Sequence, residues 1–430
     1  MRTIPEMAAV MQGLFGETAE RLGRESGFIQ RQRVLSGSSY AQTLVFSWLS
    51  NPASTMSELS QTAGSLGTRI SKQGLQERFG ESSARFMRSL LEAALEQWVE
   101  ASGCGQGVLK RFEYVEVVDS TTVVLPEVLG GLWPGCGGDG GSAALKITVA
   151  WDLRRGGLRL ELSAGRQHDQ RAALAQARAE VGALRLTDVG YFNLQRLAEL
   201  SAQGSYWIIR LKSQTTLYTQ QGQPWEWVSH LRQTTSNQVS LDVQVGAKRL
   251  AARFCAKRLS PQAAARRQAQ LREYAHKKQR PISERSWLLT LWLVCITNVP
   301  TSLLSFAEVM LLLRVRWQIE LLFKLWKSHG LLDEWRSAQP WRILTEVYAK
   351  LLALLLQHWL VLLTLWDLPN RSLVLAAQLI RKFAYPLALA LSNPDFLSQV
   401  LAALQHALPL CCMSTLRSSP HTFQLLAASP

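Results

Sequence analysis

Hydrophobic residues recur at helical spacing over residues 1–100, and short polar segments interrupt them. The clearest interruptions are 36–39 and 64–71, which are rich in serine and glycine. The pattern therefore predicts short helices joined by tight turns, and we assign residues 1–105 to an N-terminal helical domain that contacts DNA, with a plain helical scaffold as the alternative.

The periodicity changes after this helical region. Residues 114–124, with the sequence YVEVVDSTTVV, are rich in β-branched side chains and predict a strand that contains Asp119. Two further apolar runs, 144–152 and 157–164, are joined by a Leu-Arg-Arg-Gly-Gly turn and predict a β-hairpin. A β-sheet therefore begins in this part of the chain.

Helix and strand patterns alternate beyond the hairpin. Residues 170–182 are alanine-rich and predict a helix, and residues 183–193 predict a short strand that ends at Asp188. Residues 206–212 and 238–254 predict further strands. This mixture of helices and strands predicts an α/β fold.

The last part of the chain returns to helices. Residues 263–280 predict a basic helix, and residues 287–298 predict a buried strand or a pair of strands. Residues 311–327 have apolar side chains at helical spacing and contain no proline or glycine, so they predict one continuous helix. The apolar segment 331–430 predicts further helices.

One of these C-terminal segments is hydrophobic enough to be compared with a membrane span. Residues 351–366 are strongly apolar, but they fall short of the roughly 20 residues that cross a bilayer. They also contain Gln357 and His358. The start of the chain, MRTIPEMAAV, lacks the apolar core of a signal peptide. We therefore predict a buried helix and no membrane partner.

Charge narrows the choice of partner. The chain contains 47 Lys and Arg against 32 Asp and Glu, which gives a net charge of +15. That excess favours a polyanionic partner, nucleic acid first and an anionic membrane surface second. The six cysteines form no CxxC pair, so the sequence indicates neither a zinc site nor disulfides. We expect a cytoplasmic protein associated with the nucleoid.

The predicted helix 263–280 is the clearest candidate for a phosphate-contacting surface. It carries several cations against the single acid Glu273. Such a run is either a solvated helix face or a surface that contacts DNA phosphates, and the net charge favours the second. The DNA-binding candidates, which include one residue of the strand 206–212, are Arg210, Arg266, Arg267, Lys277 and Lys278.

Three carboxylates are the candidates for chemistry. Asp119 lies in a strand, Asp188 lies at a strand end, and Glu320 lies on the helix 311–327. Each has an ordinary alternative, because strand-end aspartates cap turns and Glu320 can form a surface i,i+4 pair with Arg316. A charge inside an apolar strand is costly unless it is paired or metal-bound. Carboxylates are oxygen ligands that suit Mg²⁺ or Mn²⁺.

Three separated motifs resemble those of bacterial insertion-sequence transposases of the DDE type. They are DST at Asp119, TDVGYF at Asp188 and RWQIELLFKLWK around Glu320, and they occur in the order found in that family. The resemblance runs from about residue 65 to about residue 365. It is specific because three motifs, rather than one, match.

The third motif resembles the YREK signature of one subgroup. The signature is a tyrosine, an arginine three residues later, a glutamate four residues after that and a lysine seven residues further on. Arg316, Glu320 and Lys327 match at these spacings, whereas Leu313 stands at the tyrosine position. On a helix the three matching side chains fall within about 60° of one another.

The resemblance implies a fold and a domain order. It implies an α/β fold with a ribonuclease H-like core, an inserted β-rich subdomain, and helical domains at both ends. The expected boundaries after the N-terminal domain are 106–203 for the first part of the core, 204–286 for the insert with its basic helix, 287–345 for the second part of the core with the Glu320 helix, and 346–430 for a C-terminal helical region that dimerises.

The resemblance also implies a reaction. It implies cut-and-paste transposition with two Mg²⁺ (or Mn²⁺) ions held by Asp119, Asp188 and Glu320. A strand is nicked at the transposon end, the freed 3′-hydroxyl forms a hairpin, and strand transfer follows. The implied partners are double-stranded DNA, as terminal inverted repeats and target, and a second copy of the chain in a synaptic homodimer.

Further roles follow from the same resemblance. Arg316 and Lys327 would grip DNA phosphates, and Trp292, or next Trp287, would stack on a flipped base beside the hairpin. The alternative for Trp292 is a core side chain. Two other functions stay open: a metal-dependent nuclease without strand transfer, and a sequence-specific DNA-binding protein derived from a transposase that no longer cuts.

Overall fold

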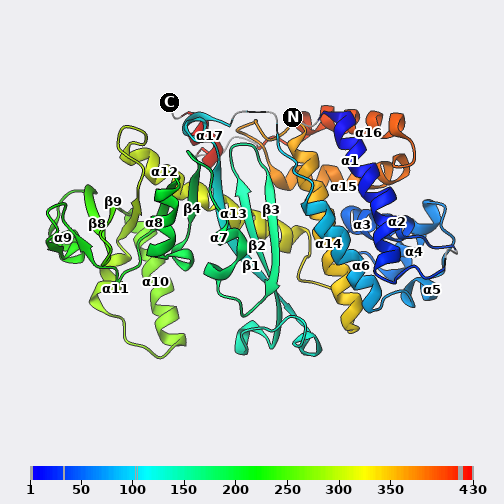
Figure 1. Ribbon diagram of the computed structural model, residues 1–430, viewed down its shortest axis with the longest axis horizontal. Helices are drawn as coiled ribbons and strands as arrows, with labels where there is room; N and C mark the ends of the chain where they lie inside the picture. The colour runs from blue at the N-terminus through cyan, green and yellow to red at the C-terminus, as the bar shows by residue number, and fades with distance from the viewer. Residues whose placement is uncertain (1–2, 32–33, 102, 104, 415–419, 429–430) are drawn as a thin grey trace. The chain divides into compact units, whose positions relative to one another are not determined.

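The computed structural model describes the chain apart from residues 1–2, 32–33, 102, 104, 415–419 and 429–430 (Figure 1). The described chain forms two compact units. The first unit comprises Met1–Gln106, Ser120–Gln167 and Ile319–Gln424, and the second unit comprises Gly107–Asp119, His168–Gln318 and Leu425–Pro430. Each unit is built from segments far apart in the sequence, so long-range packing defines both.

The N-terminal part of the first unit is helical, as predicted. Its helices are α1 (Ile4–Gly13), α2 (Ala19–Glu25), α3 (Gly37–Ser50), α4 (Met56–Ser65), α5 (Lys72–Gln76) and α6 (Glu81–Leu95). Capping boxes start α1, α3 and α4, where the hydroxyls of Thr3, Ser36 and Thr55 accept from backbone N–H groups of the first turn. The polar breaks of the sequence therefore become helix starts.

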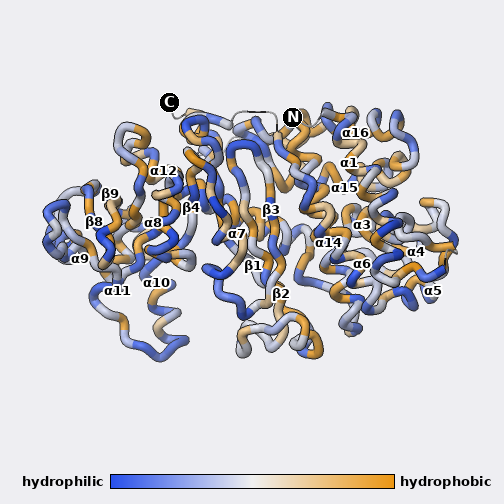
Figure 2. The backbone as a smooth tube through the Cα atoms, in the orientation of Figure 1, coloured by the Kyte–Doolittle hydropathy of each residue, from blue (hydrophilic) through white to orange (hydrophobic). Residues whose placement is uncertain are grey.

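Long apolar helices complete the first unit: α14 (Pro340–Leu362), α15 (Leu373–Ala390) and α16 (Pro394–Cys411). α14 packs against α6 and α3, and α15 packs against α3 and α16. Hydrophobic residues run along α14 and α15 (Figure 2). Both helices are long and apolar enough to cross a membrane, but the apolar window of α14 is wholly buried in protein and that of α15 is 39% buried. The prediction of a buried helix is confirmed for α14.

The first unit also contains the predicted hairpin. Its strands are β2 (Ala143–Asp152) and β3 (Leu158–Ala164), which pair antiparallel from Leu145↔Ala164 to Trp151↔Leu158. Strand β1 (Val115–Leu125) crosses from the second unit into the first, and the strand order on this side is β3-β2-β1.

The second unit is organised around a mixed sheet in the order β1-β4-β5-β10-β9-β8-β6-β7. β1, β4 and β5 are parallel, whereas β10, β9 and β8 are antiparallel to their neighbours. The strand bounds are β4 (Leu184–Thr187), β5 (Tyr206–Arg210), β6 (Leu217–Tyr218), β7 (Pro224–Trp225), β8 (Gln238–Val245), β9 (Leu250–Arg258) and β10 (Trp292–Thr297). The strands β6 to β9 precede β10 in sequence and extend the sheet beyond it. The α/β, ribonuclease H-like fold class is confirmed.

Helix α12 (Phe306–Arg316) lies against β4, β5 and β9 of this sheet. Further helices of the second unit include α8 (Leu194–Ala202), α9 (Trp227–Gln233), α10 (Pro261–Lys277) and α11 (Glu284–Leu289). The predicted basic helix is therefore confirmed as α10. The segment 287–298 is a helix end followed by β10, rather than strand throughout. Likewise 238–254 is a hairpin, because Gly246 adopts a positive φ of 67° between β8 and β9.

The helix predicted over residues 170–182 is largely wrong, although this segment is fully described. Helical turns cover only Asp169–Arg171 and α7 (Ala173–Gln176). The buried Arg185 guanidinium donates to the carbonyls of Ala175 and Ala177, at 2.9 Å and 3.3 Å. Carbonyls that a longer helix would use for its own ladder are bound by this side chain instead, which overrides the helix propensity of alanine.

The continuous helix predicted over residues 311–327 is also wrong in one respect. α12 ends at Arg316, and Trp317 caps it by donating its N–H to the carbonyls of Arg314 and Val315. α13 (Gln318–Lys324) and a π-helical turn, η7 (Leu325–His329), follow. The sequence carries no helix breaker here. The break falls beside the point where the chain passes from the second unit to the first, between Gln318 and Ile319.

Candidate active site

Two of the predicted carboxylates lie side by side in the second unit. β1 and β4 are parallel neighbours whose register pairs Val118 with Thr187, so the next residues along, Asp119 and Asp188, stand opposite each other. Neighbouring strands lie about 4.8 Å apart, and residues in register present their side chains on the same face. The carboxyl ends of parallel strands are where open α/β sheets place their ligands.

A buried ion pair fixes this register. Glu116 on β1 faces Arg185 on β4, with Oε2 and Nη2 2.8 Å apart and side chains only 12% and 6% exposed. The pair lies three residues before the two aspartates on each strand. Sequence reasoning missed both residues, although a charge at an inward position of an otherwise apolar strand was the available signal.

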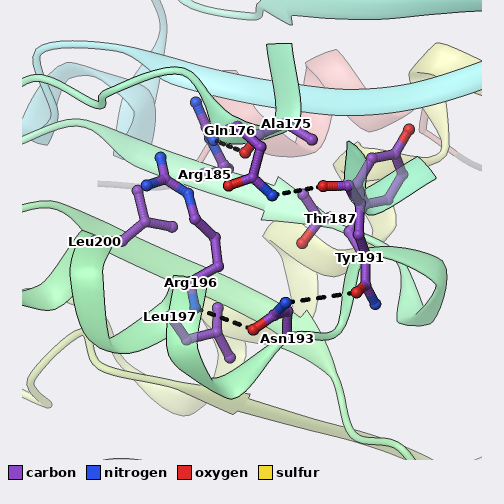
Figure 3. A pocket seen from close by; sticks show the side chains of 10 residues that line it. Ala175, Gln176, Arg185, Thr187, Tyr191, Asn193, Arg196, Leu197 and Leu200 are labelled. Carbon is purple, nitrogen blue, oxygen red and sulfur yellow. Dashed lines mark hydrogen bonds between the residues drawn. The ribbon is translucent and has the colours of Figure 1, made fainter. Parts of the chain in front are cut away.

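The turn after β4 has its own support (Figure 3). Asn193 caps α8 by accepting from the backbone N–H groups of Gln195 and Arg196. A cavity of about 20 Å³ lies behind this turn, lined among others by Thr187 and Tyr191. That volume has room for roughly one water molecule. Gln170 holds the turn itself, because its Nε2 donates to the carbonyls of Gly190 and Phe192 at 3.3 Å and 3.0 Å.

Each aspartate also faces an arginine of the second unit. Arg316, the last residue of α12, places Nη1 3.2 Å from Asp119 Oδ2, and its side chain is only 7% exposed. Arg210 ends β5, where the register Thr187↔Ile209 sets it opposite Asp188, with Nη1 3.7 Å from Oδ1. Asp119, inside β1, Asp188, just after β4, and Arg210, the last residue of β5, therefore form a row across three adjacent parallel strands.

The remaining members of the predicted signature belong to the first unit. Glu320 is half-buried on α13. Lys327, in the π-helical turn η7, donates from Nζ to the Thr122 carbonyl of β1 at 2.8 Å and lies 3.5 Å from Asp333 Oδ2. The structure thus brings Asp119 and Asp188 together within one unit and places Glu320 and Lys327 in the other.

The donor set suits a hard divalent cation. Within neither unit do the described residues gather three or more His, Cys, Asp or Glu side chains that could hold a metal. Asp119 and Asp188 nevertheless offer two carboxylates at one sheet edge, and carboxylate oxygens are the ligands that Mg²⁺ and Mn²⁺ prefer. Asp188 Oδ1 is buried and receives no hydrogen bond. The Arg210 guanidinium, 3.7 Å from this oxygen, is too distant to replace the missing hydrogen bond, so these residues fit a metal.

The family of the chain follows from comparison with known proteins. The family described as Transposase DDE domain matches residues 110–356, which is more than half of the chain. The chain belongs to the DDE transposases. It is similar to the transposase for insertion sequence element IS231F of Bacillus thuringiensis subsp. israelensis, with 28% identity over 365 residues covering 79% of this chain and 76% of the relative. The transposase for element IS1151 of Clostridium perfringens is 23% identical over 364 residues, covering 79% and 77%.

Membership settles several predictions made from the sequence. This transposase is a DNA-cleaving, phosphoryl-transferring enzyme of a bacterial insertion sequence, and DNA is its partner. The family generally uses divalent metal ions. The YREK subgroup, the individual site residues and the domain roles stay predictions. Leu313, at the tyrosine position, is buried in α12.

The cations predicted to hold DNA divide into two groups. Arg266, Lys277 and Lys278 are exposed on α10 or at its end, and Ala264 is the only buried residue of that helix. Arg267 instead turns inward and donates to the Trp292 carbonyl at 2.9 Å. Burial lowers the pKa of Arg267, and the neighbouring Arg210 charge lowers that pKa further. The first group is exposed to solvent, whereas Arg267 is partly buried.

The two candidate tryptophans of the transposase differ in burial. Trp292 is 2% exposed and belongs to the core cluster between the sheet and its helices. Trp287, on α11, is partly exposed, and the Arg272 guanidinium lies 5.0 Å from its ring centre. A base could reach Trp287 without unpacking the core, whereas Trp292 would first have to leave it. The structure therefore favours Trp287, the second choice from sequence.

Proposed function

We propose that this transposase carries out metal-dependent cut-and-paste transposition of an insertion sequence, with Asp119, Asp188 and Glu320 as its catalytic carboxylates and two Mg²⁺ (or Mn²⁺) ions as cofactors. The observation that carries the proposal is the register of β1 with β4, whose last pair is Val118 with Thr187, so that Asp119 and Asp188 both follow directly after this parallel pairing. Glu320 enters through its match to the family signature.

The protein's own groups have separable tasks in this reaction. Asp119 and Asp188 present their oxygens at the sheet edge, held in register by the strands beneath them. When bound, divalent ions supply an activated water or 3′-hydroxyl and neutralise the leaving oxygen of the phosphodiester. Arg316 and Lys327 bind phosphates near the cleaved end. Nicking, hairpin formation and strand transfer are then successive phosphoryl transfers at one site.

DNA is held outside the catalytic centre as well. Arg266, Lys277 and Lys278 are exposed on one basic helix, which suits contact with the phosphate backbone. Arg210 and Arg267 extend this charge toward Asp188. Trp287 stacks on a base extruded beside the hairpin, or Trp292 does so after local opening.

A homodimer brings two transposon ends together, and the C-terminal region 346–430 supplies its interface. Support comes from α15 and α16, where Tyr385, Leu389 and Phe396 are each more than 40% exposed. Large exposed apolar side chains are typical of protein interfaces. The protein acts on DNA in the bacterial cytoplasm, at the nucleoid.

The test uses the DNA that flanks the gene. Purified protein is incubated with this DNA in Mg²⁺ or Mn²⁺, beside Asp119→Asn, Asp188→Asn and Glu320→Gln, and products are resolved on a denaturing gel. We expect metal-dependent nicks at inverted repeats and hairpin products, which each variant loses while still binding DNA. Cleavage that survives one substitution removes that residue from the site.

Two other results would redirect the assignment. Free ends without hairpins or joined products indicate a nuclease that does not transfer strands. Binding without cutting, in wild type and variants alike, indicates a DNA-binding descendant that has lost catalysis.

A further inference from the structure

Both aspartates of the second unit carry an arginine in the DNA-free protein. Arg316 lies 3.2 Å from Asp119, and Arg210 lies 3.7 Å from Asp188. A guanidinium this close to a carboxylate forms a charge pair with it. The oxygens that the arginines face are the oxygens that a divalent cation would need.

We propose that Arg316 and Arg210 make metal binding by this transposase conditional on DNA. In the free protein they neutralise Asp119 and Asp188, and when a transposon end binds they move to its phosphates and leave the carboxylates to the metal. This inference rests on the proposed function, because it assigns a regulatory step to the same two aspartates.

Charge accounting supports the exchange. Each of these two ion pairs is neutral, so a divalent cation at the same carboxylate oxygens would place further positive charge beside both guanidiniums. Phosphates supply the missing negative charge, and arginine binds phosphate as well as it binds carboxylate. Coupling of this kind is reciprocal: DNA raises the affinity for metal, and metal raises the affinity for DNA by the same factor.

The two arginines lie where their side chains can turn from the carboxylates to DNA phosphates. Arg316 is the last residue of α12, beside the helix break at Trp317, and Arg210 is the last residue of β5 with a 40% exposed side chain. Each lies at the end of an element rather than inside one. Neither backbone segment has to unfold for the guanidinium to reorient.

The experiment measures Mn²⁺ binding to the full-length protein without DNA, by calorimetry or by the electron paramagnetic resonance signal of free Mn²⁺. Wild type is compared with Arg316→Ala and with Arg314→Ala, a matched control that removes an exposed cation of the same helix. We expect Arg316→Ala to bind Mn²⁺ on the order of fivefold more tightly or better, within the usual range of coupling between sites. Arg314→Ala should match wild type.

Adding a duplex with the flanking inverted repeat should then tighten Mn²⁺ binding by wild type far more than by Arg316→Ala. Equal or weaker Mn²⁺ binding by Arg316→Ala without DNA would show that the arginine orients Asp119, and would overturn the proposal. If thermal melting shows that this variant is unfolded, Arg210→Ala, at the more exposed position, gives the same readout.

The outcomes separate this inference from the proposed function. If the wild-type protein cuts its transposon ends in Mg²⁺ but Arg316→Ala gains no affinity for Mn²⁺, only the coupling is contradicted. Wild type that neither cuts nor binds Mn²⁺, with or without DNA, removes the catalytic assignment and the coupling together.

Discussion

At the scale of single residues, function depends on which side chains the fold leaves accessible. Asp119 and Asp188 are partly exposed at a sheet edge, whereas the charges that organise the strands, Glu116 and Arg185, are nearly buried. The same distinction separates Trp287 from Trp292. Residue type alone would not show which of these charged residues, or which of the two tryptophans, is accessible to DNA.

The two tryptophans give a prediction at this scale. Trp287→Ala should weaken binding of hairpin-forming DNA by about 1–3 kcal/mol, the usual worth of a base stacked on an aromatic ring. It should leave the unfolding free energy nearly unchanged. Trp292→Ala should instead destabilise the protein by about 3–5 kcal/mol, because it empties a core position. Urea denaturation and fluorescence binding assays on both variants test this. If Trp292→Ala weakened DNA binding and Trp287→Ala lowered stability, Trp292 would be the stacking residue.

At the scale of secondary-structure elements, the register between β1 and β4 is the feature on which the site depends. A shift of one residue would turn either aspartate to the opposite face. Glu116 and Arg185 oppose such a shift, and Arg185 also ends α7 by binding its carbonyls. One side chain therefore shapes a strand pair and a helix end.

Breaking the ion pair between Glu116 and Arg185 should lower the stability of the folded protein. Glu116→Gln removes the carboxylate that lies 2.8 Å from the buried Arg185 guanidinium, so we expect a loss of about 3 kcal/mol in the free energy of unfolding. The matched control is Glu199→Gln, which removes the 43% exposed partner of Arg196 in the same unit and should change stability by less than about 0.5 kcal/mol. Equal effects of the two substitutions in denaturation experiments would contradict the structural role of the Glu116 pair.

The basic helix α10 gives a second prediction at this scale. Replacing Lys277 and Lys278 together by alanine should reduce the slope of log affinity against log salt by about 2, since each phosphate contact contributes roughly 0.9. The exposed Lys382 of α15 serves as control and should leave the slope unchanged when replaced. Binding titrations over a range of salt concentrations measure both. An unaltered slope in the double variant would move the DNA path away from α10.

At the scale of the whole molecule, discontinuous segments of the chain build each unit. The N-terminal helices pack on α14 and α15 from the other end of the chain, and α14 is wholly buried among them. His358 ties α14 to the hairpin, with Nε2 2.7 Å from the Gly156 carbonyl. The first unit therefore depends on a buried, uncharged imidazole.

This histidine predicts a pH dependence of stability. Burial lowers the pKa of His358 from 6.5 to about 4. The unfolded chain binds the proton more tightly than the folded one. The stabilisation that neutral His358 gives the folded state is therefore complete above pH 6.5 and is lost as pH falls toward 4. Its size is on the order of 3 kcal/mol. Denaturation at pH 7 and pH 4.5 should show a smaller drop for His358→Gln than for wild type, while His406→Gln, at an exposed site, should behave as wild type.

Much of this protein was predictable from its sequence. Strand and helix periods located β1, the β2–β3 hairpin, α10 and the buried α14, because local patterns reflect which face of an element is covered. The motifs around Asp119, Asp188 and Glu320 indicated the transposase family, which the family match over residues 110–356 confirms.

Tertiary structure decided the rest, because contacts between distant segments leave no local pattern. The sequence alone determined which side chains were available and which elements could form. Packing determined that Arg185 would shorten α7 and that Trp292 would be buried. Only the pairing of β1 with β4 set Asp119 beside Asp188, since this register depends on residues 69 positions apart in the chain, such as Val115 and Leu184, and not on either strand alone.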